Sequence, residues 1–389
     1  MNRFLSLLAV LPAVLAAPAR RQEPEVIPDQ FLIQAAPGQS FEALVADVAS
    51  VLNVTDFTPD QEFHIGGFEG LRINTPQEVA DQINALDSVE RIEQDVMVEI
   101  QAVVSQANPP YGLARISSRT RGSTSYRYDD SAGAGTFVYI VDTGINLGHQ
   151  DFGGRASFGF SAVTNEANGD FNGHGTHCAG TAAGTRFGVA KRASIIDVKV
   201  IDGTGRSPLS NLVAGMDWAG RDITSKGRVG RAVVSMSLGA DNRQGDASFL
   251  DRAAQALAGQ GIFVAVASGN SNVNANVFSP ARATDVCTVG ATDSSDRRAS
   301  FSNFGAGVDV LAPGVQVTSA WIGSSTATNT ISGTSMACPH VAGVGAYLLG
   351  LEGSRNGIQL CNRIIELSTK NAISGLNGEP NRLLFNGVA

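Results

Sequence analysis

Three widely separated motifs in this chain carry side chains that could perform nucleophilic chemistry. An Asp-Thr-Gly motif begins at Asp142, a Gly-His-Gly motif contains His174, and a Gly-Thr-Ser motif ends at Ser335. A hydroxyl nucleophile, an imidazole that removes its proton and a carboxylate that orients the imidazole are the components of a hydrolytic triad. These residue types therefore predict a serine hydrolase, provided that the fold brings them together.

The segment Ser332–Leu349 predicts a loop that enters a buried helix at Ser335. Pro339 is typical of a helix start, where the first N–H groups have no partner within the helix. Small residues in the segment would let other elements approach closely. A hydroxyl at this end lies near unpaired N–H groups and the positive end of the helix dipole, which favour a developing oxyanion. The alternative, common for a serine before a helix, is that Ser335 is only an N-cap.

Other chemistries fit the same motifs less well. Asp-Thr-Gly also occurs in aspartic proteases, but these need two carboxylates at one site, and the chain has no second copy of the motif. His174 and His177 could suggest zinc, yet the His-Glu-x-x-His pattern is missing, and we expect His177 to be a buried structural residue. The residues around Ser335 also lack the Gly-x-Ser-x-Gly pattern, which disfavours an esterase of the α/β-hydrolase fold.

Composition and the first residues indicate a secreted protein. The chain has 389 residues, of which only 16% are charged, and its net charge is −8 without a basic stripe, so nucleic acid is not an expected partner. Residues 1–16 contain Arg3 and the apolar run Phe4–Leu15, which is typical of a signal peptide and too short for a membrane span. Asn53-Val54-Thr55 is a glycosylation acceptor sequence, so Asn53 is a predicted glycosylation site in a protein that we expect to be extracellular.

Residues 17–101 predict a small domain of their own. Its pattern is β-α-β-β-α-β, the ferredoxin-like arrangement, with a capping box predicted at Thr75. The expected strands and helices are Phe31–Gln34, Ser40–Leu52, Gln61–Ile65, Phe68–Ile73, a helix after Thr75, and Ile92–Ile100. No cluster of catalytic residues occurs in it, which suggests a propeptide that folds, inhibits and is removed, or else an ordinary binding module. Ala102–Pro110 is expected to be an exposed linker.

Residues 102–389 predict a large α/β domain. Apolar strands alternate with helices, which is typical of a parallel sheet covered on both faces. The expected strands are Phe137–Val141, Ile195–Val200, Ala232–Leu238 and Ile262–Ala267; the expected helices are Gly175–Ala183, Leu209–Gly220 and Asp246–Gly261, the last capped by Asp246. Because such sheets bind ligands at the carboxyl ends of their strands, Asp142, Ser237, Gly239 and Asn270 are the polar or flexible residues expected near a site.

Together these motifs resemble the subtilases, the subtilisin-like serine proteases, and closely the proteinase K branch of secreted fungal proteases. The order Asp, His, Ser along the chain is that of subtilisin. The resemblance covers nearly all of the chain after residue 16 and includes the segments Arg91–Asp95, Tyr111–Ser118 and Phe301–Gly305. It implies a subtilisin-like three-layer sandwich with a mostly parallel sheet, and the activity of a serine endopeptidase without a catalytic cofactor.

The resemblance also implies catalytic roles for individual residues. Ser335 would attack the peptide carbonyl, His174 would transfer the proton, and Asp142 would orient the imidazole. Asn270 would donate a side-chain hydrogen bond to the oxyanion, and the backbone N–H of Ser335 would be the second donor.

Substrate-binding residues follow from the same resemblance. The substrate backbone would pair as an added strand, and an uncharged pocket before the scissile bond predicts broad, apolar-leaning specificity. The strand-pairing residues would be Gly205 on one side and Ser237, Leu238 and Gly239 on the other, and the pocket would be lined by Ala267 and Gly269.

The cysteines and one carboxylate match further features of the branch. The resemblance implies a disulfide between Cys287 and Cys361 and a free buried thiol at Cys178. Cys338 departs from the proteinase K pattern; we expect two free thiols, the alternative being a Cys178–Cys338 pair. Asp309, with the backbone carbonyls of Thr284 and Val286, would bind a structural calcium ion, the alternative being a merely solvated carboxylate.

The expected partners are protein and peptide substrates and the chain's own propeptide, which would act as an intramolecular inhibitor until the precursor cuts itself near residues 101–104. Neither a membrane nor an oligomer is indicated, so a monomer is expected. The alternative functions are a catalytically inactive relative that keeps the fold for binding, and a serine hydrolase that acts on esters.

Overall fold

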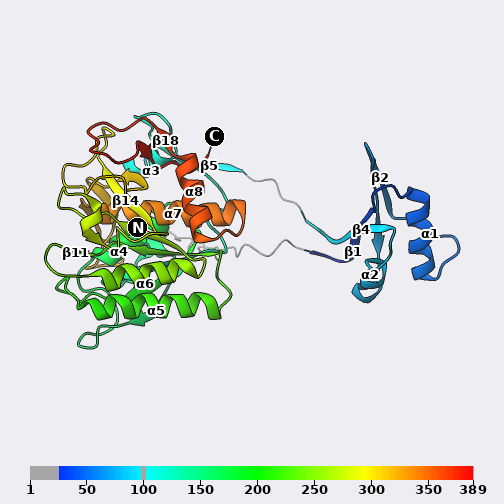
Figure 1. The fold of residues 1–389 in the computed structure, drawn as a ribbon, viewed down its shortest axis with the longest axis horizontal. Helices are drawn as coiled ribbons and strands as arrows, with labels where there is room; N and C mark the ends of the chain where they lie inside the picture. The colour runs from blue at the N-terminus through cyan, green and yellow to red at the C-terminus, as the bar shows by residue number, and fades with distance from the viewer. Residues whose placement is uncertain (1–25, 98–101, 389) are drawn as a thin grey trace, which may run out of the picture. The chain divides into compact units, whose positions relative to one another are not determined.

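The computed structural model describes residues 26–97 and 102–388, so the predicted signal peptide lies outside the described residues. The chain divides into two compact units, one within Gln22–Ile100 and the other within Gln101–Ala389 (Figure 1). In the described ranges no helix is both long enough and apolar enough to cross a membrane.

The smaller unit is a four-stranded antiparallel sheet with two helices that pack on its core. Strand order is β2-β3-β1-β4, and Leu44, Val48, Ala80 and Ile83 of the helices are buried with the sheet residues. The elements are β1 (Val26–Ala35), α1 (Phe41–Leu52), β2 (Gln61–Ile65), β3 (Phe68–Asn74), α2 (Gln77–Ile83) and β4 (Val89–Val96). This is the predicted β-α-β-β-α-β order.

Several local details of this unit differ from prediction. Helix α2 begins at Gln77 and has Pro76, in an extended conformation, as its N-cap without a side-chain cap bond. The predicted capping box at Thr75 is therefore wrong, because the extended proline places Thr75 one residue too far from the helix. The last strand begins earlier than expected, at Val89, and ends at Val96. Asn53, the predicted glycosylation site, is exposed at the left-handed C-cap of α1.

The larger unit is organised around a nine-stranded sheet of order β18-β19-β15-β14-β12-β10-β7-β9-β8, parallel except for the edge strand β18. The strands are β7 (Phe137–Asp142), β8 (Ala156–Ser161), β9 (Ser194–Lys199), β10 (Ala232–Met236), β12 (Phe263–Ala267), β14 (Cys287–Thr292), β15 (Val310–Pro313), β18 (Thr369–Lys370) and β19 (Arg382–Leu383). The helices are α3 (Tyr111–Ile116), α4 (His174–Ala183), α5 (Leu209–Ser225), α6 (Ser248–Gly259), α7 (Thr334–Glu352) and α8 (Gly357–Leu367).

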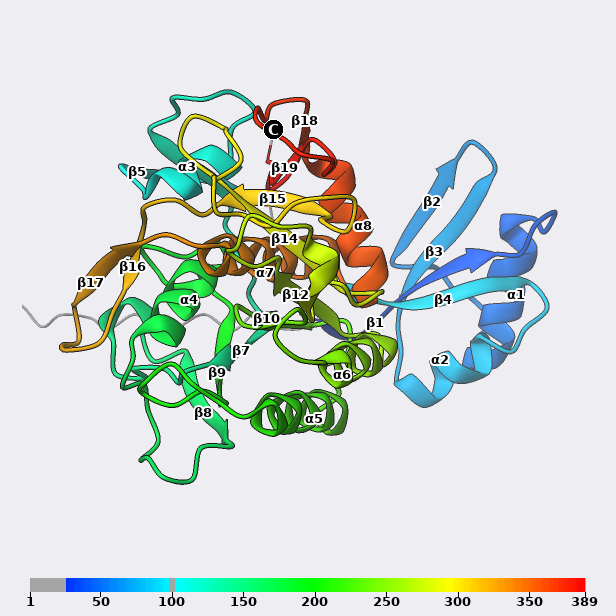
Figure 2. The ribbon, with the colours of Figure 1, turned by 60° about the vertical axis from the view of Figure 1, so that its left-hand side comes forward.

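Two hydrophobic cores lie on the two faces of this sheet. Alternate strand residues point to opposite faces, so Val138 and Ile140 of β7 pack with α4 and α7, whereas Tyr139 and Val141 pack with α5 and α6. Figure 2 shows α5 and α6 side by side along one face and α7 behind the other. The predicted α/β sandwich with a mostly parallel sheet is confirmed.

Short strands complete the larger unit. The segment Ala102–Pro110, predicted as an exposed linker, instead contains β5 (Val103–Ala107), which pairs with β6 (Ser125–Asp129) in an antiparallel ribbon. Helix α6 begins at Ser248 with Ala247 as its N-cap, although the Asp246 carboxylate still accepts the Ser248 N–H. The remaining short elements are η1 (Gln150–Phe152), β11 (Ala240–Asp241), η2 (Ala275–Val277), β13 (Phe278–Ser279), β16 (Val317–Ala320) and β17 (Thr328–Ile331).

Helix α7 is buried on nearly all sides, as its small residues predict. Gly343 shows why small residues are needed: a Cβ atom there would lie 2.6 Å from the carbonyl oxygen of Ala182 on α4. The close approach of α4 and α7 brings the first turns of these two helices together, and these turns carry His174 and Ser335.

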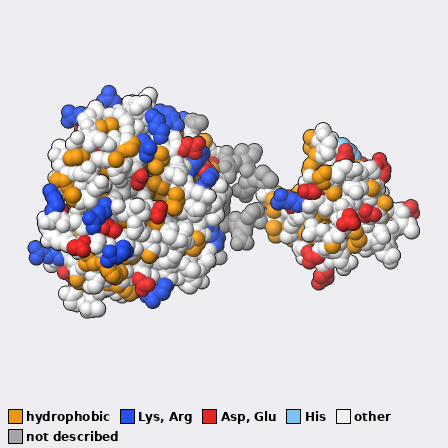
Figure 3. All heavy atoms as spheres, in the orientation of Figure 1, with side chains coloured by type: hydrophobic (Ala, Val, Ile, Leu, Met, Phe, Trp, Pro, Cys, Tyr) orange, Lys and Arg blue, Asp and Glu red, His pale blue; other side chains and the backbone are white. Residues whose placement is uncertain are grey.

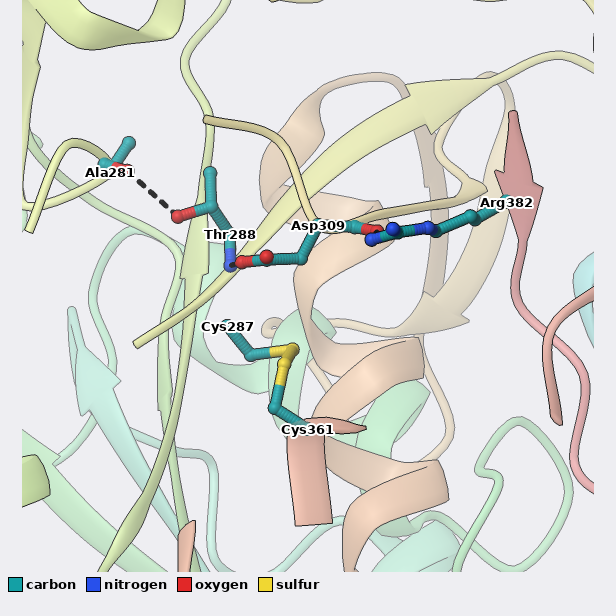
Figure 4. The surroundings of a disulfide bond; sticks show 6 residues. All are labelled: Ala281, Cys287, Thr288, Asp309, Cys361 and Arg382. Carbon is teal, nitrogen blue, oxygen red and sulfur yellow. Dashed lines mark hydrogen bonds between the residues drawn. A yellow bond between two sulfur atoms is a disulfide. The ribbon is translucent and has the colours of Figure 1, made fainter. Parts of the chain in front are cut away.

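The cysteines are arranged as the resemblance implies. A disulfide joins Cys287, at the start of β14, to Cys361 of α8 (Figure 4). Cys178 and Cys338 are free and buried.

Candidate active site

The described structure brings the carboxylate and the imidazole of the three motifs into direct contact. Asp142 is the last residue of β7, at the carboxyl edge of the sheet, and His174 is the first residue of α4. The distance from His174 Nδ1 to Asp142 Oδ1 is 2.7 Å. The Asp142 side chain is only 1% exposed and that of His174 is 27% exposed, so the ring faces solvent while its partner does not.

The electrostatic environment favours the charged form of His174. Burial of the ring disfavours its protonation, but the Asp142 carboxylate and the Cys178 sulfur together outweigh this and hold the pKa of His174 well above its usual value of 6.5. His177, by contrast, is fully buried and its Nε2 donates to the Val317 carbonyl oxygen at 2.9 Å, and burial lowers the pKa of His177 to about 4. It is a structural histidine, as predicted.

Asp170, a residue that the sequence did not single out, organises the loop between these two partners. One of its oxygens accepts hydrogen bonds from Thr143 Oγ1 and from the backbone N–H groups of Asn172 and Gly173. The other accepts both the N–H and the hydroxyl of Thr176. Asp170 thereby ties the residue after Asp142 to the first turn of α4. The sequence feature that could have indicated Asp170 is its position, since it is an acidic residue shortly before the helix that begins at His174.

Ser335 is the second residue of α7, and Gly333 is the N-cap, so Ser335 is not the helix cap. Its hydroxyl donates to the carbonyl of Ser237 at 3.1 Å. Ser237 follows β10, so the strand edge and the helix start are directly connected. The Ser335 hydroxyl therefore lies in the first turn of a helix, as predicted, and the helix begins one residue earlier than expected.

Pro339 has a different role from the one predicted. It lies inside α7, beyond the first turn, where its missing N–H would have paired with the carbonyl of Ser335. That carbonyl accepts instead from Ser237 Oγ at 2.9 Å and from Cys178 Sγ at 3.4 Å. Because Pro339 has no N–H, the Ser335 carbonyl is bonded instead by the side chain of Ser237, which follows β10, and by that of Cys178 in α4.

Cys178 links the serine and the histidine. Its sulfur lies 3.9 Å from His174 Nδ1 while it donates to the Ser335 carbonyl. Because one sulfur atom contacts both the His174 ring and the Ser335 carbonyl, the backbone of Ser335 lies close to the imidazole. Burial raises the pKa of the Cys178 thiol, which is consistent with a packing role for a neutral thiol.

Asn270 lies beside the start of α7. Its Oδ1 accepts from the Thr334 N–H at 2.8 Å and from the Thr334 hydroxyl at 2.9 Å. A Cβ atom at Gly333 would lie 3.7 Å from Asn270 Nδ2, so the amide NH₂ group is next to the N-cap of α7. Thr334 was also not singled out from the sequence; it fixes the oxygen of the amide and thereby the direction of its donor group.

The predicted substrate-binding residues border this location. Ser237 contacts Ser335 directly, and Leu238 and Gly239 continue the chain from it. Ala267 ends β12, and Gly269 donates its N–H to Thr334 Oγ1. Gly205, with φ of +79°, is in a turn closed by Asp202 and Arg206; a Cβ atom at Gly205 would lie 3.4 Å from Asn172 Nδ2, two residues before His174.

The predicted calcium ligands lie elsewhere, around the end of β14 that holds the disulfide (Figure 4). Asp309 Oδ2 accepts the Thr288 N–H at 2.8 Å. Thr284 and Val286 flank Asp285, which has a left-handed backbone with φ of +66°. Burial raises the pKa of Asp309, although nearby Arg382 opposes this shift. Asp309 is half-buried, and a carboxylate combined with backbone carbonyl oxygens is the kind of donor set that suits calcium.

Basic and acidic side chains are interspersed on the face of the larger unit shown in Figure 3.

Comparison with known proteins gives the family. Residues 133–379 match the subtilase family. The chain is 46% identical to the subtilisin-like serine protease AsES of Sarocladium strictum, over 99% of both chains, and 42% identical to a cuticle-degrading protease of Metarhizium anisopliae, over 98% of this chain and 99% of the relative. It is also similar to the crystal structure of a cold-adapted subtilisin-like serine proteinase, with a TM-score of 0.67 and 40% identity, covering 72% of this chain and 99% of that one. The chain therefore belongs to the subtilase family and is a serine endopeptidase.

Proposed function

We propose that the chain is a secreted endopeptidase in which Ser335 attacks the peptide carbonyl and forms an acyl-enzyme. The main support is the 2.7 Å contact between His174 and Asp142, with Ser335 held against the same Cys178 sulfur as His174. Rotation about χ1 of Ser335 would move its hydroxyl from the Ser237 carbonyl toward the imidazole. His174 then takes the proton and later gives it to the leaving amine, while Asp142 stabilises the imidazolium.

The oxyanion is proposed to form beside the start of α7. Asn270 supplies one donor through Nδ2, since its Oδ1 is already engaged by Thr334, and the Ser335 N–H supplies the other. Donors of this kind act where charge develops in the transition state, and one is worth about 3–4 kcal/mol.

The substrate is proposed to bind as an extended strand between Ser237–Gly239 and the turn containing Gly205. Main-chain pairing gives affinity with little sequence preference, which suits a broad protease. Ala267 and Gly269 would line the pocket for the residue before the scissile bond, and their lack of charge favours apolar side chains.

The unit within Gln22–Ile100 is proposed to be a propeptide that inhibits the enzyme until a cut near residues 101–104. Support comes from its separate fold and core, and from the absence of a catalytic motif in its sequence. The predicted signal peptide at residues 1–16 and the Asn53 sequon favour secretion, and one relative is named a cuticle-degrading protease.

Digestion of a protein substrate, with and without a serine-directed covalent inhibitor, tests this mechanism. We expect complete loss of proteolysis and a single added inhibitor mass on the peptide that contains Ser335. Proteolysis that persists after full labelling would refute the serine mechanism. An active-site peptide that stays unlabelled, in a preparation without proteolysis, would favour the inactive binding relative.

Calcium binding at Asp309 is proposed as a stabilising feature. The change Asp309→Asn removes the carboxylate charge, so the rise in melting temperature that calcium gives the unchanged enzyme should be lost. Differential scanning calorimetry in calcium and in EGTA measures this rise. The matched control is Asp217→Asn on the exposed surface of α5, whose calcium response should equal that of the unchanged enzyme. An equal calcium response in Asp309→Asn and in the unchanged enzyme would exclude this site.

A further inference from the structure

The loop that carries Asn270 has no regular secondary structure, and beyond Asn270 two backbone hydrogen bonds join it to the segment 301–304, from the Asn272 N–H to the Phe301 carbonyl and from the Phe304 N–H to the Val273 carbonyl. After β12 ends at Ala267, the residues up to Asn274 form no helix and belong to no named strand, and Asn270, Ser271 and Asn272 are exposed. Thr334 donates to the Asn270 amide oxygen and accepts the Gly269 N–H. These bonds do not hold the backbone that follows Asn270. An oxyanion donor must be positioned within a fraction of an ångström, so another group has to fix this backbone.

Asn303 is placed to do so. It is 1% exposed, and its side chain reaches both sides of Asn270. Its Oδ1 accepts the N–H groups of Ser271 and Val273 at 3.0 and 3.1 Å, and its Nδ2 donates to the Ser268 carbonyl at 2.8 Å. Its own backbone N–H donates to the Gly269 carbonyl at 2.9 Å.

This contact requires glycine at residue 269. A Cβ atom there would lie 2.4 Å from Asn303 Nδ2, and Gly269 has φ of +100°. The side chain of Asn303 therefore packs against the turn that presents Asn270, and both its amide oxygen and its amide nitrogen are bonded to that turn.

A buried ion pair supports Asn303 and the loop that it holds. Arg298 lies 3.3 Å from Glu379, and these side chains are 11% and 0% exposed. Arg298 also donates to the Ser302 carbonyl and to Asn272 Oδ1, at 2.6 and 3.0 Å. It thus connects the segment that contains Asn303 to the loop that Asn303 holds.

From these contacts we infer that Asn303 is a positioning residue for the hydrolytic reaction: it holds the Asn270 loop so that the amide donor meets the oxyanion. The inference rests on the proposed oxyanion role of Asn270. Asn303 itself does not touch the substrate. Its effect is exerted through Asn270, and it therefore appears in kcat more than in KM.

A double-mutant cycle on the processed enzyme tests this. Asn270→Ala alone is expected to lower kcat by about 10²–10³-fold. Asn303→Ala alone is expected to lower kcat by about 10–100-fold with KM changed by less than about threefold, because small displacements of a catalytic group have effects of this size. In the Asn270→Ala background, Asn303→Ala should lower kcat by less than about twofold, since there is no donor left to position.

Two controls separate positioning from general stability. Asn386→Ala removes another fully buried asparagine that holds backbone groups, those of Arg127 and Val388, and it should lower the melting temperature while leaving kcat unchanged. Asn303→Asp keeps the acceptor for Ser271 and Val273 but loses the donor to Ser268; its kcat should lie between those of the unchanged enzyme and Asn303→Ala. It also serves as the test variant if the alanine variant does not fold.

The results of this cycle distinguish the positioning role of Asn303 from the oxyanion role of Asn270. Equal losses from the Asn303 change in the presence and absence of Asn270, or a change in KM alone, would overturn the positioning role while leaving the oxyanion assignment intact. An unchanged kcat in Asn270→Ala would overturn the oxyanion assignment itself.

Discussion

Replacing Ser335 by alanine is expected to lower kcat for peptide hydrolysis by about 10⁶-fold, the loss found when the nucleophile is removed from subtilisin. The substitution removes the atom that would form the acyl-enzyme, so His174 and Asp142 have no hydroxyl to activate. Alanine fits the site, because the hydroxyl makes one hydrogen bond, to the Ser237 carbonyl, and the helix start is otherwise unchanged. Endpoint assays with a peptide substrate, over short and long incubations, measure the residual rate.

The same variant tests self-processing. If the precursor cuts itself, Ser335→Ala should accumulate with the unit within Gln22–Ile100 still attached, as mass spectrometry would show. Ser332→Ala is the matched control, since Ser332 is exposed and lies three residues earlier, and among the described residues its hydroxyl accepts only the Gln316 N–H. It should be processed and active. A normally trimmed Ser335→Ala protein would show that another protease makes the cut.

The sequence predicted the parts of the fold that follow from local pattern. The apolar run Phe137–Val141 ends at a polar residue, and in a parallel sheet such an end lies at the ligand-binding edge, where Asp142 is found. The small residues of α7 likewise predicted its burial. Both arguments use only neighbouring residues, and this is why they were reliable.

What the sequence left open depends on contacts between distant segments. The Ser335 carbonyl is held by Ser237 and Cys178, which are 98 and 157 positions away in the chain. No periodicity indicates such pairs, so Pro339 was interpreted as a residue of the first turn. The pairing of β5 with β6 was missed for the same reason: a short strand is visible only once its partner is known.

For the proposed catalytic site, the sequence predicted the reacting residues but not the residues that support them. Asp142, His174, Ser335 and Asn270 were identified through motifs, whereas Asp170, Thr334 and Asn303 hold them through hydrogen bonds to backbone groups. These supporting residues are polar; Asp170 and Asn303 lie in irregular loops and Thr334 begins α7, where hydrophobic patterns carry no information about polar contacts.

The change Asp142→Asn is expected to lower kcat by about 10⁴-fold at the optimal pH while leaving the fold intact. Asparagine has nearly the same shape, but its amide can donate to His174 Nδ1 and hold the ring in the wrong tautomer for accepting the serine proton. Loss of the carboxylate also removes the main group that raises the pKa of His174.

The pH profile separates these two effects. The base must be neutral to act, so activity of the unchanged enzyme should rise as pH increases through the raised pKa of His174. In Asp142→Asn this pKa falls, and the acid limb of the kcat/KM profile should move to lower pH even though the maximum is far smaller. Asp217→Asn, on the exposed surface of α5, should leave both the maximum and the limb unchanged. An acid limb that stays in place in Asp142→Asn would mean that a different group sets it, because the contact between Asp142 and His174 predicts that the limb moves.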